Sequence, residues 1–378
     1  YAEKVTGVPR DRIVEAAEMI GQAGKVCAIW AMGVTQHQAG SGTSTAISDL
    51  LLVTGNYGRP GTGGYPMRGH NNVQGADDFG AMANIFPGYD KVDEPEGRER
   101  WEKYWGVKLP DKIGLNNHEM PSAANDGRLK AMYIMGEEMA LVDSHAAHVQ
   151  EGLKKLEFLV VQDIFMSETA HFADVILPGA PSLEKDGTFV NTERRIQRFH
   201  KVMEPLGGSR PDWRILTDVA RYMGHDWGYT HPAQIMDEVT ANTPMLAGVN
   251  YERLEGYKSL QWPVAADGTD TPTLYVHGFH FPDKKARLVA EHWLAPDEQR
   301  DREFDLLLNN GRMLEHFHEG NLTRKSAGLN YEVPTTFVEV SPQLARERGI
   351  TDGSRVRLTS RRGSIELQAL VTDRVRGT

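Results

Sequence analysis

A dense polar cluster suited to chemistry follows a glycine-rich stretch at residues 55–64. Arg68 and His70 stand within seven positions of three amide residues, Asn71, Asn72 and Gln74. Arginine suits a small carboxylate, because its planar guanidinium donates two parallel hydrogen bonds and stays charged at any working pH. His70 can donate a hydrogen bond or exchange a proton. A surface loop without a function could share this composition, but the convergence of these residue types favours a ligand site.

Further candidates lie where apolar, strand-like runs end. Gly33 and Gly136 each follow such a run, and there bare backbone can approach a flat ring or a phosphate. Asp163 ends another run, where a carboxylate commonly accepts hydrogen bonds from a ribose or a purine. An aspartate that caps the next helix fits the same spacing about as well. A G-x-G-x-x-G fingerprint is missing from the sequence, which disfavours a simple NAD-binding unit.

The stretch from Gly311 to Arg324 combines basic and imidazole side chains. If it formed a strand, Arg312, His316 and His318 would share one face. Two histidines on a strand face could bind zinc, but no third or fourth ligand with suitable spacing follows. Phosphate or pterin contacts therefore fit Arg312 better than a metal site does.

Composition limits the classes of protein to which these residues belong. The chain has 378 residues, and no apolar run approaches the roughly 18 residues of a membrane span. A formal net charge of −10 argues against nonspecific binding of nucleic acid or anionic lipid. The single cysteine, Cys27, excludes internal disulfides and a cysteine-based cluster in this stretch. Because it lies in the apolar run Lys25–Ala31, we expect Cys27 to be a buried structural thiol.

The elements that must position the candidates follow an α/β pattern. Lys25–Ala31 is expected to be a strand, followed by a glycine turn and a helix at Thr43–Val53. Strand Leu129–Met135, helix Ser144–Leu156 and strand Phe158–Gln162 predict a parallel crossover. Other expected elements are helices at Arg10–Met19 and Asp212–Met223 and strands at Asp174–Pro178 and Gly187–Asn191.

Two changes of pattern follow in the later part of the chain. After about residue 225, Pro, Gly and polar residues predict a long surface connection or insertion. From Phe304 the pattern predicts a small β module, with a hairpin turn at Arg361–Gly363. Its expected strands are Asp305–Leu308, Thr336–Val340, Ser354–Thr359 and Ser364–Val371.

Taken together, these motifs resemble the molybdopterin oxidoreductases of the dimethyl-sulfoxide-reductase superfamily, most closely the catalytic subunits of formate dehydrogenases. The matching motifs are Met32–His37, Thr54–Gly58, Arg68–Gly75, Met135–Glu137, Val161–Phe165, Ala173–Pro178, Gly187–Arg195 and Gly311–Arg324. The resemblance covers most of the chain and weakens only at about residues 90–125 and 225–300. It implies an α/β fold of parallel-sheet, Rossmann-like layers followed by a partial double-psi β-barrel. The implied domains are 1–70, 71–300 and 304–378: the end of one α/β domain, a second α/β molybdopterin-binding domain, and the start of the barrel.

The resemblance also implies a cofactor and a reaction. Two molybdopterin guanine dinucleotides would hold one molybdenum or tungsten ion, which takes two electrons from formate and releases carbon dioxide. The electrons would pass to a [4Fe-4S] cluster and then to iron–sulfur or NAD/flavin subunits, with a cytoplasmic location expected. Arg68 matches the arginine that orients formate, and His70 lies beside it. The implied cofactor contacts are Met32, Gly33, Gln36, Gly136, Glu137, Asp163, Ser167, Gly187, Asn191, Arg312, His316, His318 and Thr323.

Two departures from the family pattern affect the expected activity. The cysteine or selenocysteine that ligates the metal, and the four cysteines of the cluster, should lie upstream and have no match here. We therefore expect a fragment that is inactive alone and contains no metal ligand. His70 stands where many relatives have glutamine, so its proton handling stays open. The alternatives are a nitrate or arsenic oxidoreductase, or a cofactor-free structural homologue in a redox complex.

Overall fold

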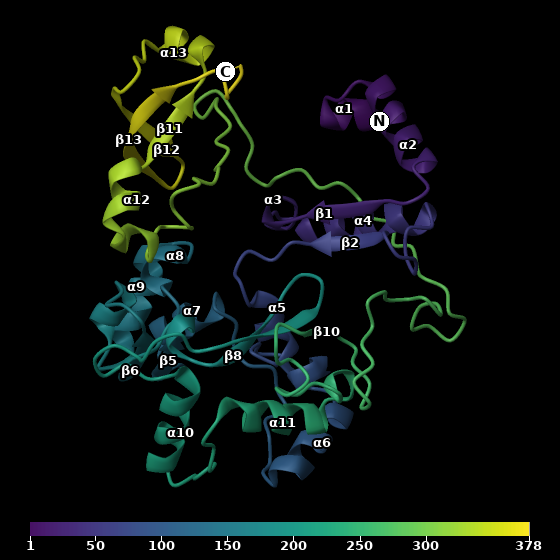
Figure 1. The fold of residues 1–378 in the computed structure, drawn as a ribbon. Helices are drawn as coiled ribbons and strands as arrows, with labels where there is room; N and C mark the ends of the chain where they lie inside the picture. The colour runs from purple at the N-terminus through teal and green to yellow at the C-terminus, as the bar shows by residue number, and fades with distance from the viewer. Residues whose placement is uncertain (378) are drawn as a thin grey trace. The chain divides into compact units, whose positions relative to one another are not determined.

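The computed structural model describes residues 1–377 and has a mixed α/β fold (Figure 1). It divides into two compact units that alternate along the chain. The first unit contains residues 1–119 and 178–295, and the second contains residues 120–177 and 296–377. The predicted division at about residues 70 and 300 stays a prediction.

The elements of the first unit are mostly short. Its helices are α1 (Ala2–Thr6), α2 (Arg10–Gln22), α3 (Met32–Thr35), α4 (Gly40–Val53), α5 (Val73–Asp78), α6 (Pro95–Trp105), α10 (Asp212–Tyr222) and α11 (Pro232–Asn242). Its strands are β1 (Cys27–Trp30), β2 (Gly63–Pro66), β3 (Ile85–Phe86), β4 (Asp90–Lys91), β8 (Gly187–Val190), β9 (Arg195–Phe199) and β10 (Ser259–Gln261). The predicted strand–turn–helix at its start is confirmed by β1, α3 and α4.

A parallel strand pair carries the polar cluster of the first unit. Strands β1 and β2 pair in parallel, with Trp30 opposite Pro66, and α4 connects them through the chain and lies along them (Figure 1). Two neighbouring parallel strands end at the same edge of their sheet, so the residues after Trp30 and after Pro66 lie side by side. This edge therefore brings the segment starting at Met32 close to the segment that contains Arg68.

An antiparallel sheet packs on the main core of the first unit. Strands β8, β9 and β10 form this sheet in the order β10-β9-β8. The buried apolar side chains below it are Val190, Ile196, Met236, Leu246, Val249, Tyr251, Leu254 and Val264. Six of these eight follow residue 225, so the predicted surface connection is wrong for residues 232–264. The segment folds into α11, a 3-10 turn and β10. Each of these elements has too few apolar residues to show a periodic pattern, but together their apolar side chains pack into one core.

The second unit contains the predicted parallel crossover. Its helices are α7 (Glu119–Asn125), α8 (Met139–Val142), α9 (Ala146–Lys155), α12 (Ala327–Glu332) and α13 (Pro342–Arg348). Its strands are β5 (Ala131–Met135), β6 (Phe158–Asp163), β7 (Val175–Pro178), β11 (Phe337–Val340), β12 (Arg355–Ser360) and β13 (Gly363–Val371). Strands β5 and β6 pair in parallel, with Met135 opposite Gln162. Val149 and Leu153, one helical turn apart on α9, are buried against them.

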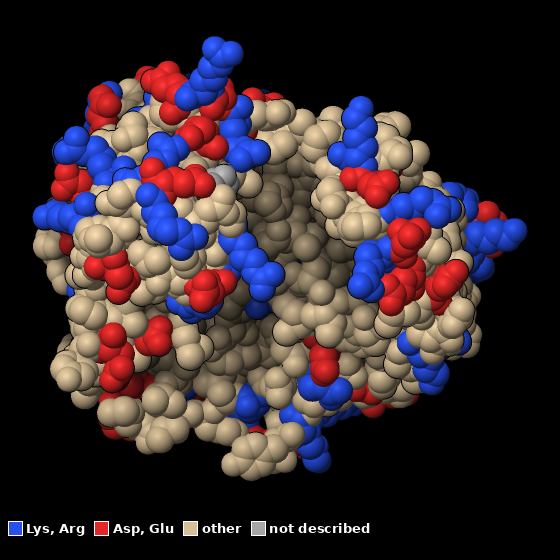
Figure 2. All heavy atoms as spheres, turned by 90° about the horizontal axis from the view of Figure 1, so that it is seen from above, with Lys and Arg blue, Asp and Glu red and all other residues tan. Residues whose placement is uncertain are grey.

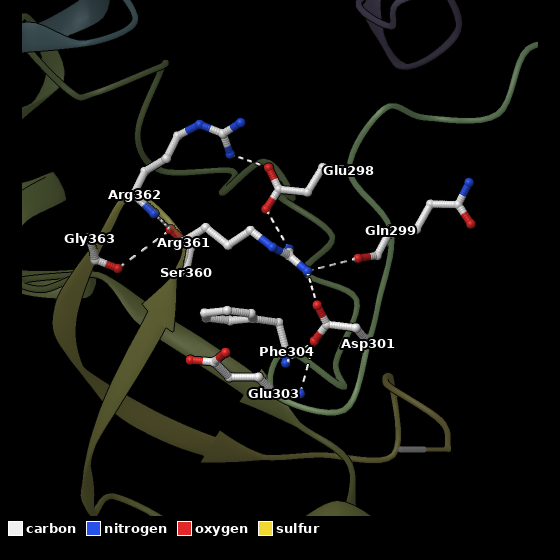
Figure 3. A network of polar contacts seen from close by, with 9 residues as sticks. All are labelled: Glu298, Gln299, Asp301, Glu303, Phe304, Ser360, Arg361, Arg362 and Gly363. Carbon is white, nitrogen blue, oxygen red and sulfur yellow. Dashed lines mark hydrogen bonds and ion pairs between the residues drawn. The ribbon is translucent and has the colours of Figure 1, made fainter.

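The C-terminal part of the second unit is an open sheet of three strands in the order β11-β13-β12. The predicted hairpin is confirmed, because β12 and β13 pair antiparallel with Ser360 opposite Gly363. Arg361 in its turn bonds to Glu298 at 2.8 Å, to Asp301 and to the carbonyl oxygen of Gln299 at 3.3 Å (Figure 3). These contacts fasten the segment at residues 298–304 to the hairpin. The strands close no barrel within residues 1–377.

Two sequence-based expectations about single segments are wrong. Asp305–Leu308 forms no strand, and Leu307 is 81% exposed, because no neighbouring strand within residues 1–377 pairs with it. Cys27 is exposed rather than buried. It begins β1, whose alternating side chains turn Cys27 and Ile29 outward and Trp30 inward.

One face of the molecule carries intermingled charges of both signs. Lysine and arginine side chains alternate with aspartate and glutamate on the face shown in Figure 2. Such interspersed charges lack the single-sign field of a nucleic-acid-binding face. Among the described residues, none of the helices has both the length and the apolar character needed to cross a bilayer.

Candidate active site

Arg68 lies two residues beyond the carboxyl end of β2. The backbone N–H of Met67 still donates to the Trp30 carbonyl oxygen at 2.7 Å, so the parallel pair continues up to this point. Met32 begins α3 at the end of the neighbouring strand. A methyl group built on Gly69 would lie 3.9 Å from Met32 Cε, which puts Met32 beside the turn that follows Arg68. The structure thus brings Met32 and Arg68 together at one sheet edge.

Two hydrogen bonds hold Arg68 itself. Its backbone N–H donates to Thr192 Oγ1 at 3.1 Å, and its Nε–H donates to Gln74 Oε1 at 3.0 Å. Within the described part of the chain, Arg68 forms no ion pair and no hydrogen bond is recorded for its two Nη atoms. The guanidinium is therefore oriented through Nε and keeps an end-on pair of donors available for a carboxylate.

A buried carboxylate lies behind Gln74. Asp78 is fully buried, and its Oδ1 accepts from Gln74 Nε2 at 2.8 Å and from the Tyr89 hydroxyl at 2.7 Å. Its Oδ2 accepts from Trp262 Nε1 at 2.6 Å. Burial raises the pKa of the Asp78 carboxyl, and the hydrogen bonds from Tyr89, Gln74 and Trp262 oppose that rise. Burial, and next the bond to Asp78, raise the pKa of the Tyr89 phenol.

Sequence reasoning missed Asp78, Tyr89 and Trp262. The spacing of four between Gln74 and Asp78 places both on one face of a helix, and this signal could have pointed to Asp78. Tyr89 and Trp262 carry no comparable signal. Both join the site only through the tertiary fold.

The other predicted contacts of the first unit have clear structural roles. The Gly33 carbonyl accepts from His37 Nε2 at 2.7 Å, and Gln36 ends α3 with its N–H bonded to the Met32 carbonyl at 2.8 Å. His70 is exposed on the segment that follows Arg68. Asn72 Oδ1 accepts the N–H of Val190 at 2.9 Å, which ties this segment to β8.

Gly187 and Asn191 lie on the hairpin of β8 and β9. A methyl group on Gly187 would meet the Phe199 ring at 2.5 Å, so close cross-strand packing requires this glycine. Asn191 Oδ1 accepts the backbone N–H groups of Glu193 and Arg195 at 2.9 and 3.1 Å. Asn191 thereby shapes the turn that presents the Thr192 hydroxyl to Arg68.

In the second unit, the predicted contacts lie beyond the carboxyl ends of β5 and β6. Gly136 has φ +64° and donates its N–H to the Gln162 carbonyl at 2.8 Å. Glu137 follows it, and Asp163 ends β6 with Oδ1 accepting the N–H of Ile164 at 2.6 Å. Ser167 is buried and its Oγ accepts the N–H of Ala170 at 3.2 Å. Since β5 and β6 are parallel neighbours, these residues share one sheet edge.

Sequence reasoning also missed Glu138, which ties these two loops together. Its carboxylate is 4% exposed and accepts the backbone N–H groups of Glu168 and Thr169 at 2.8 and 2.9 Å. The Thr169 hydroxyl donates to the same carboxylate at 2.5 Å. Glu138 therefore fixes the loop after β5 against the segment that contains Ser167.

The condition for a shared strand face at residues 312–318 is not met. The segment is not a strand: His318 has φ +52° and Gly320 has φ +82°, and both values break an extended backbone. Arg312 is exposed, whereas His316 is 3% exposed. His316 Nδ1 lies 3.0 Å from Thr323 Oγ1, and His316 Nε2 lies 2.8 Å from the Val333 carbonyl oxygen. His316 and Thr323 thus meet directly and anchor their loop.

The arrangement offers hydrogen-bond donors and bare backbone at sheet edges. Residues 1–377 hold no group of three or more His, Cys, Asp or Glu side chains placed to bind a metal ion. The first unit supplies the Arg68 donors, and the second supplies the Gly136 turn with the Asp163 carboxylate. Such residues can bind an anion and a nucleotide-like ligand through hydrogen bonds.

Comparison with known proteins gives a consistent family. A model of the molybdopterin oxidoreductase family matches residues 15–222, and a model of the molybdopterin dinucleotide-binding domain matches residues 306–377. The structure is also similar to that of "Acetylene Hydratase from Pelobacter acetylenicus", with a TM-score of 0.66 over 98% of this chain and 55% of that one. At 16% sequence identity, this likeness concerns the fold alone.

Several curated relatives match the whole chain. "Probable oxidoreductase YjgC" of Bacillus subtilis (strain 168) is 59% identical over 377 residues. "Putative formate dehydrogenase SH0748" of Staphylococcus haemolyticus (strain JCSC1435) and "Putative formate dehydrogenase YrhE" of B. subtilis are each 53% identical. All three matches cover 100% of this chain, which spans 38% of the length of each relative. The predicted fold class and resemblance are confirmed, and the chain belongs to the molybdopterin oxidoreductase family.

Proposed function

We propose that this chain is part of the catalytic subunit of a formate dehydrogenase, which oxidises formate reversibly to carbon dioxide. The observation that carries the proposal is the orientation of the Arg68 guanidinium and the availability of its donors. Its Nε is held by Gln74, and its two Nη atoms have no recorded partner within residues 1–377. A planar carboxylate as small as formate fits an end-on pair of N–H donors. Relatives whose names include formate dehydrogenase support this choice of carboxylate.

Each unit, taken by itself, presents residues that fit a pterin dinucleotide. At Gly33 and at Gly136, apart from the two chain neighbours and, for Gly33, the backbone of α3, no described atom lies within 4 Å of the position that a Cβ would occupy. A flat ring can therefore approach the bare backbone there. Asp163 Oδ2 has no recorded partner in the described residues and can accept from a guanine. When bound, the group would supply molybdenum or tungsten as the acceptor of two electrons. We also propose that the full-length protein binds two such dinucleotides, and that this chain contributes the cofactor contacts implied by the resemblance.

The chain's own residues would bind and orient the substrate. Arg68 would hold the formate carboxylate by two charge-assisted hydrogen bonds, which fixes the direction of its C–H bond. His70, on the same segment, is the candidate to receive or pass on a proton. We also propose that the electrons leave through a [4Fe-4S] cluster outside this chain, toward iron–sulfur or NAD/flavin subunits.

Replacement of Arg68 in the full-length protein tests the proposal. We expect Arg68→Ala to lower kcat/KM for formate by roughly 10²–10³-fold, because a bidentate charge-assisted contact is lost. Arg68→Lys should recover only part of the rate, since a lysine keeps the charge without the fork. The measurement is formate-dependent reduction of a dye acceptor, together with metal and pterin content, which should not change.

The control is Arg221→Ala, which removes an exposed arginine of α10 that forms an ion pair with Asp218 and lies over the Tyr222 ring. Unchanged turnover in Arg68→Ala would contradict the role given to Arg68. A wild-type protein that reduces nitrate or an arsenic oxyanion and ignores formate would favour the other enzymes of the family. If wild-type protein is purified without molybdenum, tungsten and pterin, the remaining hypothesis is a cofactor-free structural homologue in a redox complex.

A further inference from the structure

The hydrogen-bond chain behind Arg68 extends from the molecular surface into the first unit. We infer that Asp78 is a positioning residue, whose buried carboxylate sets the orientation of the Arg68 guanidinium by fixing the amide of Gln74. The inference rests on the proposed function, because it takes Arg68 as the group that binds the substrate carboxylate. It adds a determinant of substrate binding that is itself remote from the substrate.

The first step is the contact between Arg68 and Gln74. Arg68 Nε is only a donor, so the amide atom that faces it at 3.0 Å must be the oxygen. That oxygen holds the guanidinium in one rotational state and leaves the Nη edge outward. The orientation of Arg68 therefore depends on which way the Gln74 amide is turned.

The second step is the contact between Gln74 and Asp78. An ionised carboxylate only accepts hydrogen bonds, so the Gln74 atom that lies 2.8 Å from Asp78 Oδ1 must be the nitrogen. Gln74 is 6% exposed, and its Nε2 also lies 3.2 Å from the Tyr89 hydroxyl. Both contacts favour the same amide orientation. Asp78 thus prevents the amide flip that would turn an N–H group toward Arg68.

The third step concerns what holds Asp78. Tyr89 donates to one carboxylate oxygen and Trp262 to the other, so all three partners of Asp78 act as donors. Trp262 is itself held, because Arg194 donates to its carbonyl oxygen and stacks on its ring at 5.4 Å. A buried carboxylate is retained at low cost only when its hydrogen bonds are complete, as they are here.

The direction of each hydrogen bond from donor to acceptor along Arg68, Gln74 and Asp78 determines the effect of Asp78→Asn. If the new amide keeps its oxygen toward Gln74, its N–H₂ group faces the Trp262 N–H, and two donors oppose each other. If the new amide turns, it faces Gln74 with N–H₂. Gln74 must then flip and present N–H₂ to Arg68. Trp262 is half-buried and cannot turn to water, whereas Arg68 is exposed and can move away from an opposing donor. We therefore expect the second outcome, which releases Arg68.

A second substitution can match donors with acceptors again by reversing the direction of the hydrogen bond between positions 74 and 78. In the double variant Gln74→Glu with Asp78→Asn, the new carboxylate accepts from Arg68 with one oxygen and from the new amide with the other. The amide oxygen is then free to accept from Trp262. Tyr89 accepts from the new amide and donates its own O–H to the new carboxylate oxygen, which replaces the Gln74 Nε2 that lies 3.2 Å away. Every donor again faces an acceptor, so the orientation of Arg68 should return. A role limited to packing gives no reason for this rescue.

The test uses full-length holoenzyme with formate as the probe. In Asp78→Asn we expect KM for formate to rise about tenfold while kcat falls less than about threefold, the pattern of a lost binding interaction. Crystal structures of wild type and variants give a readout that needs no activity. The Arg68 Nη atoms should move by about 1 Å or divide between two positions in Asp78→Asn, which is enough to weaken binding. The double variant should return Arg68 to its original position and lower KM again.

The matched control is Glu184→Gln, which alters another buried carboxyl of the first unit. Glu184 is 5% exposed and accepts from the Leu206 N–H at 3.2 Å, away from Arg68. Its KM and its Arg68 position should equal those of wild type. Unchanged KM and an unmoved Arg68 in Asp78→Asn would overturn the inference, as would a double variant that is worse than the single one.

The outcomes separate this inference from the proposed function. If wild type does not oxidise formate, the proposed function fails, while the position of Arg68 still tests the role of Asp78. If formate is oxidised equally well in every variant, only the role of Asp78 fails. Should Asp78→Asn not fold, the double variant is compared directly with Gln74→Met, which removes the acceptor for Arg68 and must show the displaced guanidinium.

Discussion

At the scale of single residues, buried carboxylates organise the loops that carry the candidate contacts. Glu138 in the second unit accepts two backbone N–H groups and one hydroxyl, all from Glu168 and Thr169. Backbone donors that lose such an acceptor inside a protein have no water to replace it. The Gly136 turn and the Ser167 segment are therefore expected to depend on the charge and shape of this one side chain.

We expect Glu138→Gln to destabilise the protein by about 1–3 kcal/mol, because one acceptor oxygen becomes a donor that faces a backbone N–H. Thermal unfolding of the full-length protein measures this loss. Glu168→Gln is the control, since that neighbouring side chain is exposed and has no recorded partner in the described residues. Equal melting temperatures for both variants would show that Glu138 does not hold these loops.

The candidate site was predictable from sequence only as far as its local motifs reach. Arg68 and Gln74 stand in one motif, and their residue types already indicate an anion site. Trp262 lies 184 positions from Asp78 and reaches it through the tertiary fold alone. The pairing of His316 with Thr323 was also hidden, because the segment is a loop with a positive φ at His318, and residue spacing does not indicate which side chains meet in such a loop.

At the scale of elements, side-chain contacts fasten an irregular segment to the β12–β13 hairpin (Figure 3). Arg362 next to Arg361 also pairs with Glu298, and the Arg361 guanidinium stacks on the Phe304 ring at 4.6 Å. Hydrogen bonds from Arg362 and Arg361 lower the pKa of Glu298. The backbone N–H of Phe304 is the main cause that lowers the pKa of Asp301.

We expect Arg361→Ala to release residues 298–304 while global stability changes little, because the contacts are exposed. The segment contains Arg300 and Arg302, so tryptic cleavage after these residues measures its release. Cleavage should become several-fold faster, as expected for local opening. Arg346→Ala on α13 removes an exposed arginine with no recorded partner in the described chain and should leave cleavage unchanged.

The same contacts should depend on pH with a definite sign. A carboxyl whose pKa is lowered by folding adds stability above its ordinary pKa, which is 4.5 for Glu298. This stability is lost as the pH falls through the lowered value in the folded protein. Hydrogen exchange at residues 298–304, corrected for the intrinsic rate at each pH, should therefore rise in acid. In Arg361→Ala this rise should be smaller.

The elements differ in how well their patterns predict them. The strands β5 and β6 and the helix between them were expected because apolar runs, glycine and amphipathic spacing agree there. Residues 232–264 were misread, since each short element contributes only a few core residues. Gly248 illustrates the cause, because a methyl group there would lie 1.9 Å from the Ala265 carbonyl oxygen. A periodic pattern of apolar residues cannot predict such a close approach of two backbone segments.

At the scale of the whole molecule, the chain spans 38% of the length of the curated relatives that it matches. We expect residues 1–378 expressed alone to show no formate-dependent dye reduction, even when folded. The physical reason is that the role proposed for Arg68 is limited to binding the carboxylate, whereas the lone Cys27 is exposed on β1 and matches no metal ligand of the family.

Circular dichroism of the isolated chain is the control for folding, and the full-length protein under the same assay is the control for activity. Formate oxidation by the isolated chain would contradict this expectation. It would also mean that a residue of this chain binds the metal, although the resemblance assigns a metal ligand to none of them.

The alternation of the two units along the chain constrains how the protein can be made. The first unit needs residues 178–295, which are translated after the start of the second, and the second is complete only with residues beyond 296. Neither unit can thus finish folding on the ribosome before the other has begun, unlike domains that are synthesised one after the other. Splitting the gene at any single point between residues 119 and 296 would leave at least one unit with its two segments on different polypeptides.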